Sequence, residues 1–349
     1  MRLYRFVLLS LFVFSGLAEA RDSIRLKNGK ELEVVITKET KTHIEFKDAK
    51  TGASQKKSVD ELVRVLYEDA NPNYVSMAGA LDSGDYLLAL KSGIKAKGSQ
   101  KDSEKNWHSS YIDFYIGFCL YKLSEKSPET YAGKAIGFLK KTAASHAESR
   151  FGTPASYYLA GSLAIKGDYV NASKLYQKVA KDKARLFWVK KARVAEVNLL
   201  MMQKKYDDAL SACESEMKAG NLSPELLSIY TTLLIEKKKD YQKAYSIAEK
   251  LVCRGDQPLK AAVYELKGCA AFHLKKYEDG LDSLLRATLL ADQNGSASSR
   301  ANVYLAGTIK SLLLKKSSQY GTWEYQSKLS SCIKKMSVAD QKMYMRFKL

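Results

Sequence analysis

A turn followed by a tyrosine recurs along this chain at an almost constant spacing. The tyrosines of the last four copies are 37, 35 and 36 residues apart: Tyr169, Tyr206, Tyr241 and Tyr277. An earlier copy begins at Tyr86, and a small residue, Ala or Gly, follows each of these tyrosines three positions later. A fixed period of about 20–50 residues is typical of repeat proteins, in which each unit buries its apolar face against its neighbours. The sequence therefore predicts a stack of similar units rather than one globular core.

Each unit contains two helical segments joined by the turn. From position 72 onward the apolar residues follow a helical period, and a small residue recurs in the first helix of a unit. These small residues, which allow the second helix to approach closely, are Gly117, Ala160, Gly268 and Gly307. Prolines stand where a first helix should begin, a position at which the missing N–H costs nothing. They are Pro72, Pro154, Pro224 and Pro258.

This pattern resembles the tetratricopeptide repeat (TPR), a helix–turn–helix unit of about 34 residues. The resemblance covers roughly three quarters of the chain. It implies a mainly α fold, a TPR-like α-solenoid of about seven helical hairpins over residues 72–335. A final helix within residues 336–349 is expected to cap the end of the stack.

The segment over residues 21–69 follows a different pattern, that of short β-strands. Apolar and polar residues alternate, and Asn28-Gly29 is a strong signal for a two-residue hairpin turn. Five short strands in so few residues must curl to bury one face. The segment resembles the small five-stranded SH3-like or Sm-like β-barrels found at the start of exported bacterial repeat proteins.

The first twenty residues have the pattern of a secretory signal peptide. Two arginines precede the apolar stretch Phe6–Phe14, and Ala18-Glu19-Ala20 supplies small residues at a cleavage site. The alternative is an uncleaved membrane anchor, but the apolar stretch is short for a span of about 20 residues. We therefore expect cleavage after Ala20 and an exported mature protein that does not span a membrane. The periplasm is the expected compartment.

The chain is strongly basic, with 57 Lys and Arg against 38 Asp and Glu. Removing the signal peptide leaves 55 basic and 37 acidic side chains, a net charge of +18. With 46% hydrophobic and 27% charged residues, the composition indicates a folded globular chain and excludes an acidic, disordered one. An exported chain of this charge is not expected to meet nucleic acid. It meets anionic envelope polymers, lipid headgroups or acidic proteins instead.

Sequence motifs for catalysis or cofactor binding are absent. The four histidines have no metal-ligand spacing, and there is no glycine-rich phosphate loop or nucleophile elbow. The five cysteines are odd in number and lie far apart in apolar helical contexts, so we expect them to be free and buried. We therefore expect no enzyme activity, no metal and no cofactor.

The TPR resemblance implies that the first helices of the hairpins line a concave groove. Transferring the family pattern residue by residue gives the inward-facing positions, which we predict to bind a partner. They are Tyr111, Phe114, Phe118, Tyr121, Tyr157, Lys191, Asn198, Phe272 and His273. Asn198 matches the asparagine that grips a terminal carboxylate in some family members, although Val194 replaces the lysine that accompanies it there. The alternative is that these aromatic residues only pack between helices.

Three functions remain open from the sequence. The first is a non-catalytic exported scaffold whose groove binds a protein or peptide partner, with an acidic partner favoured by the basic rim. The second is a binder of anionic envelope polysaccharide or lipid headgroups, which salt would weaken steeply. The third is an enzyme, which would need a cluster of acid, base or nucleophilic groups that no spacing indicates.

Overall fold

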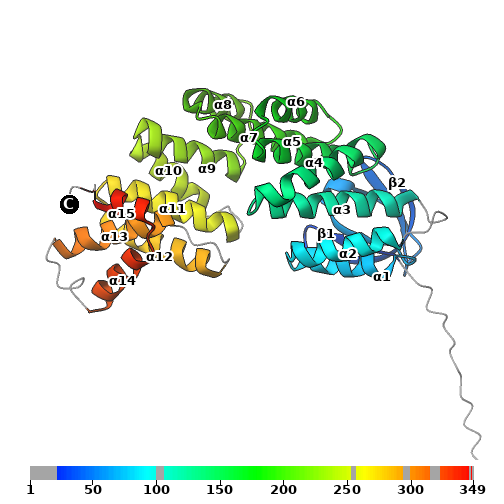
Figure 1. Ribbon diagram of the computed structural model, residues 1–349, viewed down its shortest axis with the longest axis horizontal. Coiled ribbons are helices and arrows are strands. Elements are labelled where there is room, and N and C mark those ends of the chain that lie inside the picture. The colour runs from blue at the N-terminus through cyan, green and yellow to red at the C-terminus, as the bar shows by residue number, and fades with distance from the viewer. Residues whose placement is uncertain are drawn as a thin grey trace, which may run out of the picture. The chain divides into compact units, whose positions relative to one another are not determined.

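The structure is a computed structural model that describes residues 22–99, 106–252, 257–293, 299–314, 323–345 and 347 (Figure 1). The predicted signal peptide lies outside the described residues. The chain divides into two compact units, each with a hydrophobic core of its own. The first unit contains the described residues up to Leu175 together with Asp182–Trp188. The second contains Tyr176–Lys181 together with the described residues from Val189 onward.

Five antiparallel strands open the first unit. They are β1 (Asp22–Leu26), β2 (Glu31–Glu39), β3 (His43–Asp48), β4 (Ser54–Ser58) and β5 (Leu62–Leu66). Their order in the sheet is β4-β3-β2-β1-β5, so four strands form a meander and β5 returns beside β1. The turn at Asn28-Gly29 joins β1 to β2, and Gly29 has the positive φ of 84° that glycine tolerates best. The predicted strands are therefore confirmed as one five-stranded sheet.

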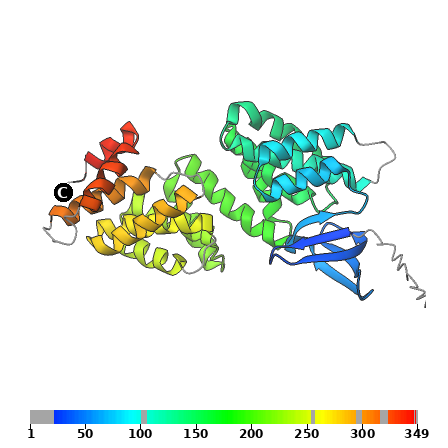
Figure 2. The ribbon, with the colours of Figure 1, turned by 90° about the horizontal axis from the view of Figure 1, so that it is seen from below.

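One face of this sheet is buried and the other meets water. Ile24, Val34 and Ile44 are fully buried, whereas Val35 and Val63 point to the exposed side. This alternation follows from the two-residue period of a strand. A sheet with one apolar face needs a covering layer, and in this unit the helices provide it. In Figure 2 the blue strands lie beneath the cyan and green helices.

The helices of the first unit follow in antiparallel pairs. They are α1 (Pro72–Asp82), α2 (Tyr86–Gly98), α3 (Asn106–Ser124), α4 (Pro128–Ser145) and α5 (Gly152–Ile165). The next two helices, α6 (Tyr169–Ala180) and α7 (Leu186–Met202), each contribute residues to both units. Helix α3 packs between α2 and α4, and α4 packs on α5.

A buried arginine ties the sheet to the helices of the first unit. Arg185, just before α7, is 3% exposed, and its Nε and Nη2 atoms donate to Oδ1 of Asp60 at 3.0 and 2.7 Å. Its Nη1 atom donates to the backbone oxygens of Lys41 and Arg150 at 2.9 and 2.8 Å. The sheet is therefore tied to the segments that precede α5 and α7.

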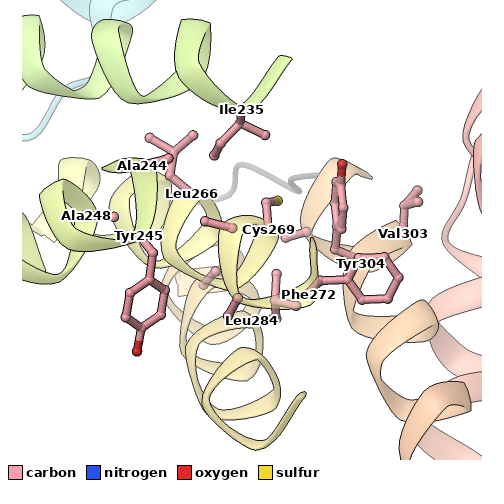
Figure 3. Packing of buried hydrophobic residues seen from close by; sticks show 14 of the residues in the cluster. Ile235, Ala244, Tyr245, Ala248, Leu266, Cys269, Phe272, Leu284, Val303 and Tyr304 are labelled. Atoms are coloured by element: carbon pink, nitrogen blue, oxygen red, sulfur yellow. The ribbon is translucent and has the colours of Figure 1, made fainter. Parts of the chain in front are cut away.

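The second unit consists of helices only. They are α8 (Tyr206–Lys218), α9 (Pro224–Leu233), α10 (Tyr241–Val252), α11 (Gln257–His273), α12 (Tyr277–Gln293), α13 (Ser299–Leu314), α14 (Trp323–Lys334) and α15 (Val338–Met345), with a π-helical turn η2 (Leu234–Lys238) after α9. The core residues of α10, α11 and α12 are largely small or aliphatic, including Ala244, Ala248, Cys269 and Leu284 (Figure 3). A Cβ atom at Gly268 would lie 2.4 Å from Cγ of Leu284, so α11 and α12 pack closer than a side chain would allow.

The predicted fold class is confirmed. In chain order the fourteen helices α1 to α14 make seven pairs, and α15 follows as the expected capping helix. The recurring tyrosine is the first residue of a second helix in five of these pairs: α2, α6, α8, α10 and α12. The sequence period therefore marks a repeated structural position.

Candidate partner-binding surface

Two of the aromatic residues predicted to face a groove belong to the buried core. Tyr111 on α3 is 1% exposed, and its hydroxyl donates to Oε2 of Glu39 at 2.6 Å. Phe114 is 6% exposed and stacks on Phe151 with 4.6 Å between the ring centroids. The sheet and the start of α5 cover this end of α3. A partner cannot reach these two rings, so we correct the predicted surface by removing both.

Three other predicted residues lie together on a partly exposed aromatic face. Phe118 and Tyr121 on α3 and Tyr157 on α5 surround the ring of Tyr158, with centroid distances of 4.9, 5.1 and 5.2 Å. Trp188, at the start of α7, continues the face 5.3 Å from the Tyr157 centroid. We name the connected rings the aromatic row: Tyr86, Phe118, Tyr121, Tyr157, Tyr158, Phe187 and Trp188. All but Trp188 retain contact with solvent.

Local sequence explains how the row forms. Phe114, Phe118 and Tyr121 are spaced by four and three residues, which places them along one side of α3. On α5 a Cβ atom at Gly161 would lie 2.8 Å from Cε2 of Tyr121. The absence of a side chain at Gly161 therefore lets the tyrosine ring lie directly on the α5 backbone.

The row has an apolar centre and a cation at either end. Lys122 Nζ lies 5.9 Å from the centroid of the Tyr86 ring, and Lys27 Nζ lies 3.7 Å from that of Phe187. Burial raises the pKa of the Tyr158 phenol, so this ring stays neutral at physiological pH. An arrangement of this kind can bury apolar side chains and favour nearby negative charge.

Sequence analysis missed four members of the row. These are Tyr86, Tyr158, Phe187 and Trp188. The signal that could have found three of them is the adjacency of two aromatic residues, in Tyr157-Tyr158 and in Phe187-Trp188. The family register selects only Tyr157 of the first pair and neither residue of the second as inward-facing, whereas both rings of each pair pack into the same row.

The second unit places its predicted aromatic residues in and near its core. Phe272 is buried, with its ring centroid 4.7 Å from that of Phe347, so we also remove it from the predicted surface. His273 is half-buried and stacks on Tyr241 with 4.1 Å between the ring centroids. Its Nε2 atom lies 3.1 Å from the hydroxyl of Tyr304. This histidine is held by α10 and α13.

The two polar residues predicted in the second unit lie on α7. Asn198 is exposed and Lys191 is half-buried. Their spacing of seven residues places them on the same side of this helix. They lie on a different helix from His273, and partner binding by Lys191 and Asn198 stays a prediction.

A polar cavity of about 550 Å³ beside the end of β2 contains groups that suggest catalysis at first sight. Glu39, Arg150, His146 and Ser149 line it, together with further residues of α3, α4 and the β2–β3 turn. However, the hydroxyl of Ser149 donates to the backbone oxygen of His146 at 2.8 Å. The imidazole Nε2 instead lies 3.9 Å from Oδ2 of Asp113. Since a nucleophilic serine needs its hydrogen bond to the imidazole ring, this set is not arranged for acyl transfer.

Metal and thiol chemistry find no support in the part of the chain that the structure describes. Within it, no three His, Cys, Asp or Glu residues are grouped to hold a metal ion. Cys119, Cys213, Cys269 and Cys332 are free and buried, and Cys253 lies outside the described residues. Burial raises the pKa of the Cys119 and Cys213 thiols to about 12, which makes them poor nucleophiles. No described helix is both long and apolar enough to cross a membrane.

Comparison with known proteins supports the fold. No protein-family model matches the chain, and no curated protein matches it. Among solved structures it is similar to the APC/C hetero-tetramer Cut9–Hcn1, with a TM-score of 0.52 and 18% identity over 77% of this chain and 51% of that one. It is also similar to the apo form of RapI, with a TM-score of 0.50 and 11% identity over 78% of this chain and 79% of that one. A tetratricopeptide repeat protein from Parabacteroides merdae matches with a TM-score of 0.45 and 12% identity over 75% of this chain and 97% of that one.

The fold is a TPR-like solenoid. This agrees with the helical pairs and with the tyrosines that open their second helices. At such low sequence identity the similarity concerns the fold alone. The chain spans about half of the Cut9–Hcn1 chain that it matches.

Proposed function

We propose that this chain is a non-catalytic scaffold and that the aromatic row binds a protein partner. The observation that carries this proposal is the row itself, in which seven rings form one connected chain and all but Trp188 keep part of their surface in water. Partly exposed Tyr, Trp and Phe residues contribute most of the binding energy at many protein interfaces. The Ser149 geometry in the polar cavity gives no support to an enzyme.

The partner that fits is an apolar peptide segment with acidic residues beside it. Its apolar side chains would cover the exposed parts of Phe118, Tyr121 and Tyr157. Lys27, at one end of the row, favours negative charge on the partner and speeds its encounter, whereas Lys122 at the other end is paired with Glu125. We therefore propose that the partner predicted from the sequence binds through α3, α5 and the start of α7.

We further propose that the protein is exported and that the mature chain starts at Arg21, with the periplasm as its location. The charged start, the short apolar stretch and the small residues before the cut support this proposal. N-terminal sequencing of the protein from its native organism tests it. A mature protein that retains Met1 in the cytoplasm would contradict it.

Photo-crosslinking tests the row directly. A photoreactive phenylalanine in place of Tyr157 should capture a partner in cells of the native organism. The same residue in place of Tyr131, a half-buried tyrosine of α4 outside the row, is the matched control and should capture nothing. The change Phe118→Ser should abolish capture at position 157. Equal capture at both positions, or capture that survives Phe118→Ser, would contradict the proposal.

Melting curves distinguish binding residues from core residues. Tyr157→Ser should lower the free energy of unfolding by about 1 kcal/mol or less, because the ring keeps contact with water. Phe114→Ala should lower it by about 3–5 kcal/mol, because this ring is buried against Phe151. A large loss for Tyr157→Ser would place that ring in the core and remove it from the proposed surface.

A further inference from the structure

Helix α2 exposes three large aliphatic side chains on one face. Leu87, Leu88 and Ile94 are 45%, 48% and 56% exposed. Leu87 and Ile94 are seven residues apart, and Leu88 lies beside them, so the helical period groups them on one side. Lys91 and Lys95 are exposed on the same side, between and after the aliphatic residues. We name these five residues the α2 face.

The opposite side of α2 fixes this orientation. Ala89 and Ala96 are fully buried. A Cβ atom at Gly93 would lie 2.8 Å from Sδ of Met77 on α1 and 3.0 Å from Cγ1 of Ile116 on α3. Helix α2 is therefore wedged between α1 and α3 and cannot roll to hide its leucines. The α2 face is a permanent part of the surface of this unit.

Helices α2 and α4 are both rich in lysine, although α2 begins at the exposed N-cap Asp85, whose Oδ1 accepts from the Leu88 amide. Helix α2 carries three lysines and no acidic residue, and α4 carries three lysines and a single glutamate. Both helices pack on α3. Lys134 and Lys140 of α4 are exposed, as Lys91 and Lys95 of α2 are. One lysine of α2, Lys97, forms an ion pair with Asp113 and contributes less to the outer charge.

We propose that the α2 face binds the interface of a membrane that contains anionic phospholipid. Leu87, Leu88 and Ile94 would insert among the upper parts of the acyl chains. Lys91 and Lys95 would extend their methylene stems beside them and place their ammonium groups among the lipid phosphates. Lys134 and Lys140 of α4 would add attraction at longer range. This surface shares no residue with the aromatic row, although Tyr86 of the row immediately precedes Leu87 on α2, and it does not depend on the proposed protein partner.

The composition of the α2 face favours a lipid interface over an acidic protein. Its three apolar residues are all aliphatic, whereas the binding energy at protein interfaces comes mainly from Trp, Tyr and Arg, with Leu under-represented. Lysines beside exposed aliphatic residues can lay their methylene stems along a lipid interface while their ammonium groups stay in water.

Vesicle binding by the full mature chain tests the charged part of the proposal. The chain should co-sediment with phosphatidylcholine vesicles that contain about 30% phosphatidylglycerol, and should bind phosphatidylcholine alone much more weakly. In the double variant Lys91→Glu/Lys95→Glu, the partition coefficient should fall at least about 25-fold, since each lysine near an anionic surface contributes about fivefold. The matched control Lys218→Glu/Lys250→Glu changes two exposed lysines of the second unit and should retain binding.

A second set of variants tests the apolar part. Replacing Leu87, Leu88 and Ile94 together by serine should lower vesicle binding about tenfold or more while leaving the melting temperature unchanged, because all three are exposed. In a Leu88→Trp variant, brominated lipid in the same vesicles should quench the fluorescence of the introduced side chain. This readout reports insertion and does not depend on the stability of the serine variant.

Several outcomes would overturn the proposal. The first is failure of the wild-type chain to bind anionic vesicles at about 50 mM salt, where electrostatic screening is weak. Loss of binding in the control variant equal to that in Lys91→Glu/Lys95→Glu would move the binding site elsewhere. A dimer of the wild-type chain that dissociates in the serine variant would show that a second copy covers the α2 face. Binding of an acidic protein through these residues, without vesicle binding, would identify a protein as the occupant.

Discussion

The two units share one type of helical pair, but different chemistry holds each of them together. The first unit buries Arg150 and Arg185 and gathers aromatic rings where its sheet meets its helices. The second unit has buried aromatic rings of its own, around Phe272 and Tyr304, but it packs α11 on α12 through small and aliphatic residues, such as Gly268 against Leu284. Backbone oxygens in loops outside the strands and helices have no partner within an element, and Arg185 donates to two of them, those of Lys41 and Arg150. Packing the sheet against these loops therefore uses a long buried donor.

The outer helices differ between the units as well. In the first unit α2 and α4 together carry six lysines and one glutamate. In the second unit α8, α10 and α12 together carry four basic and nine acidic residues. The positive charge is therefore unevenly distributed over the solenoid. A repeated fold does not imply a repeated surface, and the two outer surfaces are expected to attract different partners.

The largest expected effect comes from breaking the link between sheet and helices in the first unit. Arg185→Ala removes four hydrogen bonds and leaves Asp60 without its partner. Removing one member of a buried ion pair costs about 3–5 kcal/mol. Urea denaturation should show this loss. Hydrogen exchange should rise in β5 and α5 while the amides of α11 keep their protection.

The control for this prediction is an exposed arginine of the second unit. Arg286 pairs with Asp282 on the surface of α12, and Arg286→Ala should leave the urea midpoint close to that of the wild type, because water screens this exposed pair. If Arg185→Ala increased hydrogen exchange in α11 as much as in α5, the two units would unfold together. The contrast between them would then be contradicted.

A matched pair of glycines allows the two units to be compared through a stability effect of intermediate magnitude. Gly117 in the first unit faces Leu139, and Gly268 in the second faces Leu284, each closer than a Cβ atom allows. Alanine at either position should cost about 1–3 kcal/mol through overpacking. The loss should be larger at Gly268, where the Cβ atom would lie 2.4 Å from its neighbour compared with 2.8 Å at Gly117. Thermal melts of the two variants would show whether both helical pairs tolerate an added methyl group equally well.

The hairpin turns offer a smaller contrast between the units. Gly84 and Gly167 adopt positive φ before α2 and α6, whereas Lys204, Lys239 and Lys275 adopt positive φ before the corresponding helices of the second unit. A side chain in this conformation costs about 1 kcal/mol. Gly167→Lys should therefore destabilise by about 1 kcal/mol, and Lys239→Gly should stabilise by about 0.5 kcal/mol, less than the strain because glycine gains entropy when unfolded. Equal stability of Lys239→Gly and the wild type would mean that the turn lysine gains a compensating contact.

The smallest expected effect is a pH dependence in the second unit. Burial, with a smaller contribution from Lys239, lowers the pKa of His273 below its ordinary value of 6.5. The unfolded chain therefore binds a proton more readily than the folded one, so stability is retained above about pH 6.5 and falls as the pH drops below it. The melting temperature of wild type should fall between about pH 7 and pH 5, and His273→Asn should flatten that slope. An unchanged slope in His273→Asn would assign the pH effect to other groups.

The helical fold could be predicted because its local signals repeat. Tyr86, Tyr169 and Tyr206 each open a second helix, and prolines such as Pro72 and Pro224 open first helices, as the sequence indicated. These positions depend on turn geometry and on the packing of neighbouring helices, so the same residue types recur at a fixed spacing in the sequence. The chain could therefore be divided into helical pairs without knowledge of any long-range contact.

The binding surface could be predicted only in part. Phe114 and Phe118 lie on the same side of α3 and look alike in the sequence, yet the first is buried and the second is partly exposed. The difference arises because Phe151, before α5, covers Phe114, and nothing in the α3 sequence records this. An apolar stripe shows that something covers a helix face. It does not distinguish another segment of the same chain from a partner.

The hydrogen bonds between Asp60 and Arg185 join positions 125 residues apart, and this separation has a consequence for the order of folding. The strands are among the earliest of the described segments to be synthesised. They can pair into a sheet with one apolar face as soon as they have left the ribosome. The arginine that secures this sheet becomes available only after α1 to α6 have been made. Closing so long a loop is slow compared with forming neighbouring helices. The sheet can dock on α1 as soon as that helix is made, because Tyr74 donates to the backbone oxygen of Val65 and Asp82 pairs with Arg25 and Arg64. Its link to Arg185 is expected to form last, so the end of the sheet around Asp60 stays unsecured for longest.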